Sequence, residues 1–327
     1  MPVAYAYTKA KDELVMIARA ATLPDDFAPL DAFFRTCEAA DSLDLDLHRH
    51  ALQDPQTPDL FQVCFDADLH VQGFARLHLS EVEDGTEGRY WYYVSPSAID
   101  QALAASLLQW AEQQARGRCV QHSQNRGRLS TASRADHPAR VQFLEANGFM
   151  RERCFLTMKQ ALLEAPPALE VPAGYALRTP TLADLASYTE LHNLTFRDHW
   201  NSPPITVDDL RAEQMAPSYR PELDILAVTP DGTLVSFCTA TIEAGMGKRE
   251  GAERAVGLIS TLGTHPAHRG RGLGSALLLH TLRALHALGI DLCYISVDTA
   301  NVTGAGRLYE AVGFQTFETW LGYFKYV

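Results

Sequence analysis

The sequence predicts an α/β protein made of two similar domains, each a twisted mixed sheet flanked by helices. Its 327 residues exceed the roughly 100–200 residues of a single domain. A proline-rich segment, EAPPALEVP at 164–172, divides the chain almost in half and favours an extended linker. Two stretches recur: FLEANGF at 143–149 resembles LYEAVGF at 308–314, and YVSP at 93–96 parallels GTHP at 263–266. We therefore expect one domain at 1–163, the linker at 164–172, and a second domain at 173–327.

In the second half, strand and helix patterns alternate. Thr181 is placed to cap a helix running to about residue 192, and Thr206 a helix to about residue 214. Leucine-rich 272–288 predicts a third helix ending at Gly289, and a fourth at 302–311 ends at Gly313. A Pro-Asp-Gly turn makes two of the strands a hairpin. The predicted strands are 175–178, 225–228, 234–243, 255–264, 292–298, 315–318 and 320–326.

The first half has a fainter pattern, with strands near 71–79 and 89–94 and a helix over 102–115. Composition is that of a soluble globular chain, 46% hydrophobic and 21% charged. No secretory signal or membrane-length apolar run is present, and the six cysteines are scattered, so we expect a cytoplasmic protein with reduced thiols. A net charge of −12 argues against a nucleic-acid partner. Tandem domains are compatible with a monomer, but the sequence leaves the oligomeric state open.

The segment HPAHRGRGLG at 265–274 lies where a strand passes into a helix. It lacks the lysine of a P-loop, and Ser275 stands where the dinucleotide fingerprint needs glycine. Glycines let an anion approach the main chain closely, and the first N–H groups of a helix have no internal partner. The helix dipole and two arginines add positive charge. The segment therefore predicts a site for a diphosphate held mainly by backbone, although a glycine-rich turn without a ligand is the alternative.

The run LGTHPAHRGRGLGS at 262–275 resembles the acetyl-CoA signature of the Gcn5-related N-acetyltransferases, and NVTGAGRLYEAVGF at 301–314 resembles the family's second motif. The resemblance covers residues 175–327. It implies that the loop backbone binds the coenzyme A pyrophosphate and that the strand at 262–264 pairs with the pantetheine arm. The cofactor-binding residues it implies are Leu262, Gly263, Thr264, Arg269, Gly270, Arg271, Gly272, Leu273, Gly274, Ser275, Asn301 and Tyr309.

The resemblance also places Tyr309 near the coenzyme's sulfur. A phenol with a pKa of about 10 can protonate a leaving thiolate whose conjugate acid has a pKa of about 8.5, so Tyr309 is the candidate general acid. A core aromatic on an amphipathic helix is the alternative for Tyr309. Asn301 can instead cap the helix that begins after it.

An ammonium must lose its proton before it attacks a thioester, often to a carboxylate or a histidine. Many relatives carry a glutamate on the strand before the loop, but residues 257–262 offer none. The candidate bases are Glu243 and the group His192, Asp198 and His199, of which Glu243 and His199 are taken as the catalytic candidates. The region between the first two helices usually covers the acceptor in this family, and surface residues at a helix end are the alternative reading. The acceptor-side candidates are His192, Phe196, Asp198 and Trp200.

We expect no metal site, because His48 and His50 have no third ligand at useful spacing. The first half is predicted to be a degenerate, non-catalytic copy. In its alignment with the second half, residues 99–105 replace the glycine loop without a glycine or an arginine, and Leu144 replaces Tyr309.

The sequence thus predicts an acetyl-CoA-dependent N-acetyltransferase that acts on the primary amine of a small molecule. Transfer would be direct, within a ternary complex, and the active site would lie in the second half. The tandem organisation resembles that of the mycothiol synthases in this family, whose acceptor is a cysteinyl amino-sugar conjugate. The missing strand glutamate departs from that group, and antibiotic amines and protein N-termini are acceptors of other relatives. A non-catalytic acyl-CoA sensor or interaction module is the alternative function.

Overall fold

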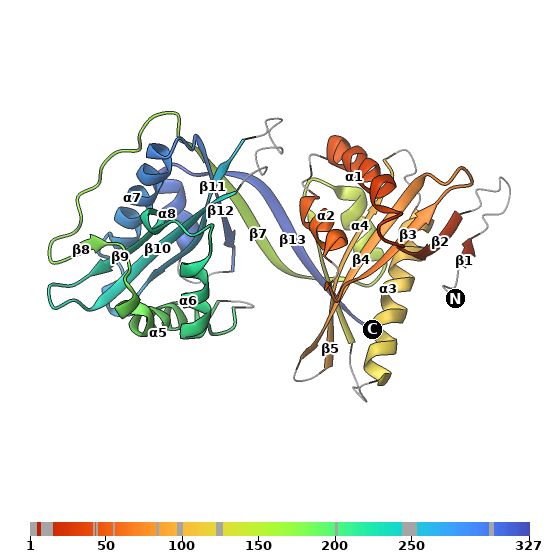
Figure 1. Ribbon diagram of the computed structural model, residues 1–327, viewed down its shortest axis with the longest axis horizontal. Helices are drawn as coiled ribbons and strands as arrows, with labels where there is room; N and C mark the ends of the chain where they lie inside the picture. The colour runs from red at the N-terminus through yellow and green to blue at the C-terminus, as the bar shows by residue number, and fades with distance from the viewer. Residues whose placement is uncertain are drawn as a thin grey trace. The chain divides into compact units, whose positions relative to one another are not determined.

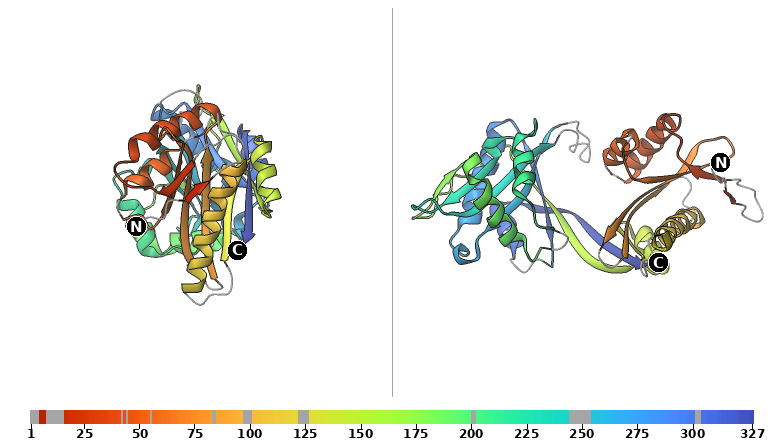
Figure 2. Two further views of the ribbon diagram at one scale, coloured as in Figure 1. Left: turned by 90° about the vertical axis from the view of Figure 1, so that its right-hand side faces the viewer. Right: turned by 60° about the horizontal axis from the view of Figure 1, so that its bottom comes forward.

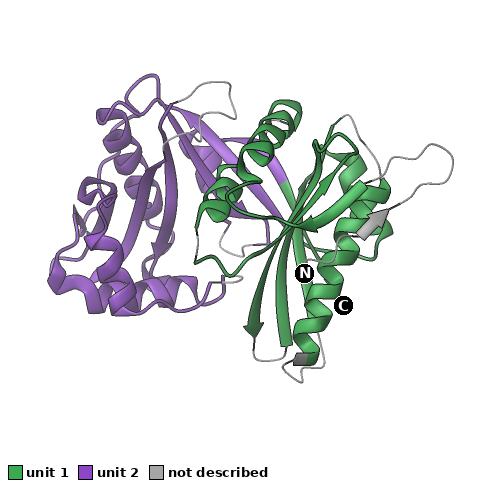
Figure 3. Ribbon diagram, turned by 45° about the vertical axis from the view of Figure 1, so that its right-hand side comes forward, with its two compact units in different colours: residues 1–153, 320–327 green, residues 154–319 purple. Residues whose placement is uncertain are grey.

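A computed structural model describes residues 5–7, 16–41, 43, 45–54, 56–82, 85–96, 101–121, 127–199, 202–243, 254–300 and 304–327. The chain divides into two compact units (Figure 3). Unit 1 comprises Met1–Arg153 and Trp320–Val327, and unit 2 comprises Cys154–Thr319. No helix among the described residues has both the length and the apolar character that crossing a bilayer requires.

Unit 1 is a mixed sheet with strand order β1-β2-β3-β4-β5-β6-β13. Neighbouring strands are antiparallel except β5 and β6, which are parallel. Buried residues of α1 and α2, such as Phe33, Phe34 and Leu52, pack on one face of the sheet, and α3 covers the opposite face (Figure 2). The elements are β1 (Tyr5–Tyr7), β2 (Met16–Ala20), α1 (Phe27–Asp41), α2 (Asp46–Gln53), β3 (Leu60–Phe65), β4 (Val71–Val82), β5 (Gly85–Val94), α3 (Gln101–Gln121), β6 (Gly127–Arg134), α4 (Pro138–Ala146), the start of β7 (Met150–Ala161) and the end of β13 (Gln315–Tyr326).

The strands of unit 2 follow the order β7-β12-β11-β10-β9-β8 in the sheet. Only β11 and β12 are parallel among these pairs of described strands. Thr206 forms a capping box with Asp209 at the start of α6, as its position before an amphipathic run predicts. The elements are β8 (Ala176–Arg178), α5 (Leu185–Phe196), α6 (Val207–Met215), β9 (Asp224–Val228), β10 (Leu234–Glu243), β11 (Val256–Thr264), α7 (Leu273–Ala287), β12 (Leu292–Asp298) and α8 (Ala305–Val312).

The core of unit 2 follows from the two-residue period of its strands. On β9, Ile225 and Ala227 pack in the cluster that contains α7 and α8, while Leu226 and Val228 pack in the cluster that contains α5 and α6. The sheet therefore has two buried faces, with α7 and α8 on one and α5 and α6 on the other (Figure 1).

Asp224, at the start of β9, is a buried carboxyl group. It accepts hydrogen bonds from the Tyr188 hydroxyl at 2.9 Å and the Tyr219 hydroxyl at 2.8 Å. Burial raises the pKa of Asp224 to about 6, although the two tyrosine hydrogen bonds act in the opposite direction. The Asp224 carboxyl is thus hydrogen-bonded by neutral hydroxyl groups. None of its hydrogen-bond partners among the described residues is a cation that would offset its charge.

The bounds of the two units differ from the ranges 1–163, 164–172 and 173–327 expected from the sequence. The chain passes from unit 1 to unit 2 within β7 and returns within β13 (Figure 3). Phe155–Ala161 of β7 pair with β12, so this piece of the first half is a strand of unit 2. The expected linker also lies in unit 2, where Arg283 of α7 donates a hydrogen bond to the Pro166 carbonyl at 2.5 Å.

The predicted fold class, a mixed α/β sheet protein, is confirmed. The prediction of two separate strands at 315–318 and 320–326 is wrong, because β13 runs unbroken over Gln315–Tyr326. Residues 320–326 of β13 pair with β6, a strand far away in the sequence. A local sequence pattern cannot reveal such a pairing.

Candidate functional site

The site begins where two parallel strands of unit 2 separate. Parallel pairing of β11 with β12 runs from Gly257↔Cys293 to Ile259↔Ile295. The register of β11 against β10 then shifts at Ser260, which is the extra residue of a β-bulge. Beyond the bulge β11 continues beside β10, and Ser296–Asp298 of β12 continue beside β7. The strands diverge, and the edge of β11 that faces β12 is left open over its last residues.

A cavity of about 720 Å³ lies in this opening. Its walls come from the diverging strands, from the loop between β11 and α7, from the C-terminal end of α5, and from α8. Predicted cofactor residues that line it are Leu262, Gly263, Thr264, Arg269, Gly270, Gly272, Leu273, Gly274, Ser275 and Tyr309. A volume of this size is within the usual range for small-molecule sites.

The loop at 269–275 adopts a conformation that depends on its glycines. Gly270 and Gly272 have φ of +72° and +82°, in the left-handed region, and Gly272 is the N-cap of α7. A Cβ on Gly274 would lie 2.9 Å from Leu308 Cδ1, so this glycine lets α7 approach α8 closely. Across the described residues, the N–H groups of 270–275 have no hydrogen-bond acceptor, whereas Ala276 N–H donates to the Gly272 carbonyl at 3.0 Å. These unpaired donors beside the cavity fit the diphosphate of a coenzyme A.

The two arginines of the loop have different positions. Arg269 lines the cavity, and its Nε donates to the Thr264 carbonyl at 3.0 Å. Arg271, also predicted to bind cofactor, does not belong to the lining. Its guanidinium donates to the Tyr175 hydroxyl at 2.9 Å and to the Ala267 carbonyl at 3.2 Å. Arg271 is therefore engaged with the protein rather than directed into the cavity.

Tyr309 lies on α8 with its side chain 7% exposed. Its ring packs against Phe314, with centroids 6.2 Å apart. Burial, with a smaller contribution from Cys238, raises the pKa of Tyr309, so the phenol holds its proton at neutral pH. Within the described chain the Tyr309 hydroxyl has no hydrogen-bond partner. The cavity thus contains a protonated phenol that is available to a ligand.

The predicted acceptor-side residues are only partly brought together. Phe196, Asp198 and His199 line the cavity at the end of α5. His192 does not, because its ring stacks between Phe196 at 4.7 Å and Phe237 at 5.7 Å, and burial lowers its pKa. Glu243 is also outside the lining and accepts a hydrogen bond from Thr241 at 2.7 Å. Trp200 and Asn301 lie outside the described residues.

Several lining residues had no signal in the sequence. Phe155 belongs to β7, which the pattern of the first half did not reveal. Ser296 and Asp298 enter the cavity because β12 separates from β11, a consequence of pairing between distant segments. Asp298 is buried, and its Oδ1 accepts the Ala300 N–H at 2.9 Å. Arg197, beside the predicted Phe196 and Asp198, also lines the cavity.

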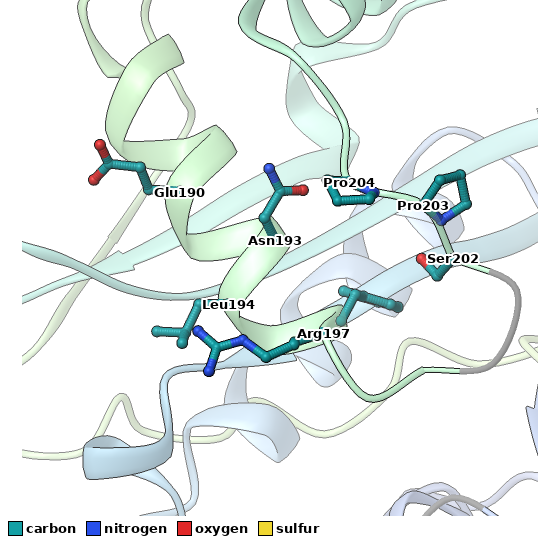
Figure 4. A pocket seen from close by; sticks show the side chains of 8 residues that line it. Glu190, Asn193, Leu194, Arg197, Ser202, Pro203 and Pro204 are labelled. Carbon is teal, nitrogen blue, oxygen red and sulfur yellow. The ribbon is translucent and has the colours of Figure 1, made fainter. Parts of the chain in front are cut away.

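A smaller cavity of about 420 Å³ lies between α5 and the segment that carries Pro203 and Pro204 (Figure 4). It shares the lining residues Leu194, Phe196 and Arg197 with the larger cavity. The Asn193 amide exchanges two hydrogen bonds of 2.9 Å with the backbone of Ile205. This exchange holds the segment after α5 against the helix.

Unit 1 contains a similar separation of two parallel strands. There, however, the side chain of Arg140 occupies the edge of β5. The parallel pairing of β5 with β6 runs from Thr86↔Gly127 to Arg89↔Ser130, and β6 continues beside β13. Arg140 of α4 donates to the Tyr92 carbonyl of β5 at 2.7 Å, and its guanidinium lies 3.9 Å from the centre of the Tyr92 ring. Leu144, which aligns with Tyr309 in the sequence repeat, is fully buried.

Residues 185–314 match the acetyltransferase (GNAT) family. The mycothiol acetyltransferase of Kineococcus radiotolerans is 33% identical over 243 residues, which cover 72% of this chain and 71% of that protein. The chain belongs to the Gcn5-related N-acetyltransferase family. It is an N-acetyltransferase, and the family's donor is an acyl-CoA.

Two other relatives bear the same name. The mycothiol acetyltransferase of Thermobispora bispora is 36% identical over 180 residues, covering 55% of this chain and 59% of that protein. That of Salinispora tropica is 27% identical over 302 residues, covering 91% and 92%. The matched region therefore spans from somewhat over half to nearly all of these relatives' length.

Solved structures show the same fold. A Gcn5-related N-acetyltransferase from Sphaerobacter thermophilus has a TM-score of 0.78 at 24% identity, with 95% of each chain covered. A tandem GNAT protein from the clavulanic acid biosynthesis pathway has a TM-score of 0.69 at 18% identity, covering 95% of this chain and 98% of that chain. At these identities the likeness concerns the fold alone.

Proposed function

We propose that this chain transfers the acetyl group of acetyl-CoA to the primary amine of a small molecule, and that unit 2 holds the active site. One observation carries the proposal. The open edge of β11, the unpaired amides of Gly270 and of residues 272–275, and the Tyr309 phenol all border one cavity. These are the three groups that an acyl-CoA, with its diphosphate, its amide-bearing arm and its thioester sulfur, would need.

Each part of the cavity has a separate role in this proposal. The amides of 270–275 and Arg269 bind the diphosphate, and the edge of β11 at 262–264 pairs with the pantetheine arm. Bound acetyl-CoA supplies the acetyl thioester. A backbone N–H near Leu262 donates to the carbonyl oxygen, where negative charge develops during attack. Tyr309 carries its proton at neutral pH and passes it to the departing sulfur. Since burial raises the pKa of Tyr309 and weakens it as an acid, this transfer depends on close positioning of the sulfur.

The proton of the incoming ammonium goes to a group on the acceptor side. His199 is the base we favour over Glu243, because His199 lines the cavity and Glu243 does not. Asp198 supplies the negative charge that attracts a cationic amine, and Phe196 supplies an apolar wall. The amine is therefore placed at the end of α5.

We propose direct transfer, without an acyl group on the protein. Burial raises the pKa of the Cys238 thiol to about 12, and it also raises the pKa of Cys293. Both side chains are fully buried in the core of unit 2, so neither thiol supplies a reactive thiolate. The amine and the acyl-CoA must then occupy the cavity together.

Unit 1 is assigned no catalytic role. The Tyr92 carbonyl of β5 already accepts a hydrogen bond from Arg140, in the place where a pantetheine amide would donate. Leu144, in place of a tyrosine, has no proton to donate to a leaving thiolate. We therefore propose that unit 1 binds no acyl-CoA and that the chain has one active site.

The experiment that tests the function is a thiol-release assay with acetyl-CoA and a panel of amines. The panel contains a cysteine-bearing amino sugar, an aminoglycoside and a peptide with a free N-terminus, because the named relatives are mycothiol acetyltransferases. We expect amine-dependent release of one CoA per acetylated product. Tight CoA binding without release by any amine would instead assign the chain as an acyl-CoA sensor.

A further inference from the structure

The segment between β7 and β8, residues 162–175, contains the proline-rich stretch that the sequence predicts to be a linker. It is held against the rest of unit 2 by hydrogen bonds. The Leu162 N–H donates to the Asp291 carbonyl at 2.7 Å, and Arg283 of α7 donates to the Pro166 carbonyl at 2.5 Å. Pro172 Cγ lies 3.7 Å from the position that a Cβ on Gly272 would occupy. The segment thus ends beside the N-terminus of α7, against the glycine loop.

Tyr175, the last residue before β8, connects this segment to the loop. Its hydroxyl accepts a hydrogen bond from Arg271 Nη1 at 2.9 Å and lies 2.9 Å from His268 Nδ1. Since Arg271 can only donate, the phenol proton can be donated to His268 Nδ1 in the tautomer that leaves this nitrogen unprotonated. The two rings meet edge to face, with centroids 5.7 Å apart. One hydroxyl therefore joins residues on both sides of Gly270.

This contact bears on the shape of the loop. Gly270 and Gly272 have positive φ and no side chain that could restrain their backbone. Contacts of neighbouring residues must therefore hold the loop in its conformation. On the N-terminal side of Gly270, Arg269 donates a hydrogen bond to the Thr264 carbonyl. On its C-terminal side, Arg271 donates to the Tyr175 hydroxyl and to the Ala267 carbonyl. His268 itself lines the cavity.

We propose that Tyr175 is a positioning residue for the acyl-CoA site. It holds Arg271 and His268 and thereby preorganises the amides of 270–275 for the diphosphate. The inference rests on the proposed placement of the diphosphate at this loop. Acetyl transfer itself uses neither Tyr175 nor Arg271, so the effect is on donor binding and not on the chemical step.

The test compares Tyr175→Phe with the wild type, because this change removes one hydroxyl and keeps the ring. We expect the dissociation constant of CoA, measured by calorimetry, to rise about tenfold, as for the loss of one hydrogen bond to a charged group. The KM for acetyl-CoA should rise in parallel. The kcat at saturating acetyl-CoA and the KM for the amine should stay within about twofold of wild type.

A double-mutant cycle shows whether Tyr175 acts through Arg271. Arg271→Ala should weaken CoA binding, and adding Tyr175→Phe to it should weaken binding by less than Tyr175→Phe does alone, because only the contact to His268 is then left to lose. Tyr219→Phe is the matched control: it removes a tyrosine hydrogen bond to Asp224 in the same unit, away from the loop, and should lower the Tm without changing CoA affinity. Unchanged CoA affinity in Tyr175→Phe, or independent effects of the two substitutions, would overturn the inference. Because CoA binding is measured directly, the result stands even if no amine is acetylated.

Discussion

Replacing Tyr309 by phenylalanine separates catalysis from binding. The hydroxyl donates to no atom of the described residues, so its removal breaks no hydrogen bond among them. The ring keeps its packing against Phe314, because phenylalanine has the same outline. We therefore expect the Tm to change by no more than about one or two degrees, and the CoA dissociation constant by no more than about twofold.

The expected effect on turnover is much larger. A positioned general acid contributes about 10²–10⁴-fold, so kcat should fall at least about 100-fold in Tyr309→Phe, which corresponds to roughly 2.7 kcal/mol of transition-state stabilisation. The raised pKa of Tyr309 has a further consequence. The phenol stays protonated from about pH 6 to about pH 9, so any alkaline decline of the wild-type rate in that range must come from another group.

The assay is thiol release at saturating acetyl-CoA across that pH range, with calorimetry of CoA binding on the same samples. Tyr219→Phe serves again as the control tyrosine substitution, and it should leave kcat unchanged. A Tyr309→Phe enzyme with wild-type kcat would refute the acid role. A loss of CoA affinity equal to the loss in rate would assign Tyr309 to binding instead.

Three further predictions concern stability and stoichiometry. The folded pKa of Asp224, about 6, exceeds its ordinary 3.8, so the wild type should lose about 2 kcal/mol of stability as the pH rises from 4 to 6. Asp224→Asn should remove this loss in urea titrations at a series of pH values. In Gly263→Ala the new Cβ would lie 2.5 Å from Phe237 Cζ, so thermal unfolding should show a cost of about 1–3 kcal/mol, whereas Gly306→Ala, in open space on α8, should stabilise. Calorimetry should give one CoA per chain, and two would contradict the assignment of unit 1.

The parts of the fold that the sequence predicts well are those with local causes. Thr206 begins α6 because its hydroxyl and Asp209 form a capping box within one turn. The glycine loop is recognisable because its conformation and its free amides depend on neighbouring residues in the chain. The strand β10 has the predicted bounds, since a Pro-Asp-Gly turn fixes its start.

What the sequence does not reveal depends on pairing between distant segments. β7 joins unit 2 only because it pairs with β12, so neither the true unit bounds nor the lining residue Phe155 can be read locally. The same cause explains the single long β13, which changes from one unit to the other along its length. Arg271 turns away from the cavity because Tyr175, from a segment far earlier in the chain, accepts its hydrogen bond.

The most direct measurement is a calorimetric titration of the wild type and Gly272→Val with two ligands, CoA and pantetheine. Pantetheine carries the amide-bearing arm and the thiol but has no diphosphate. A valine at φ +82° should distort the loop at a cost of about 1–2 kcal/mol while the chain stays folded. If bare amides bind the diphosphate, Gly272→Val should bind CoA at least about tenfold more weakly and pantetheine as the wild type does. Wild-type CoA affinity in a folded Gly272→Val would contradict that claim.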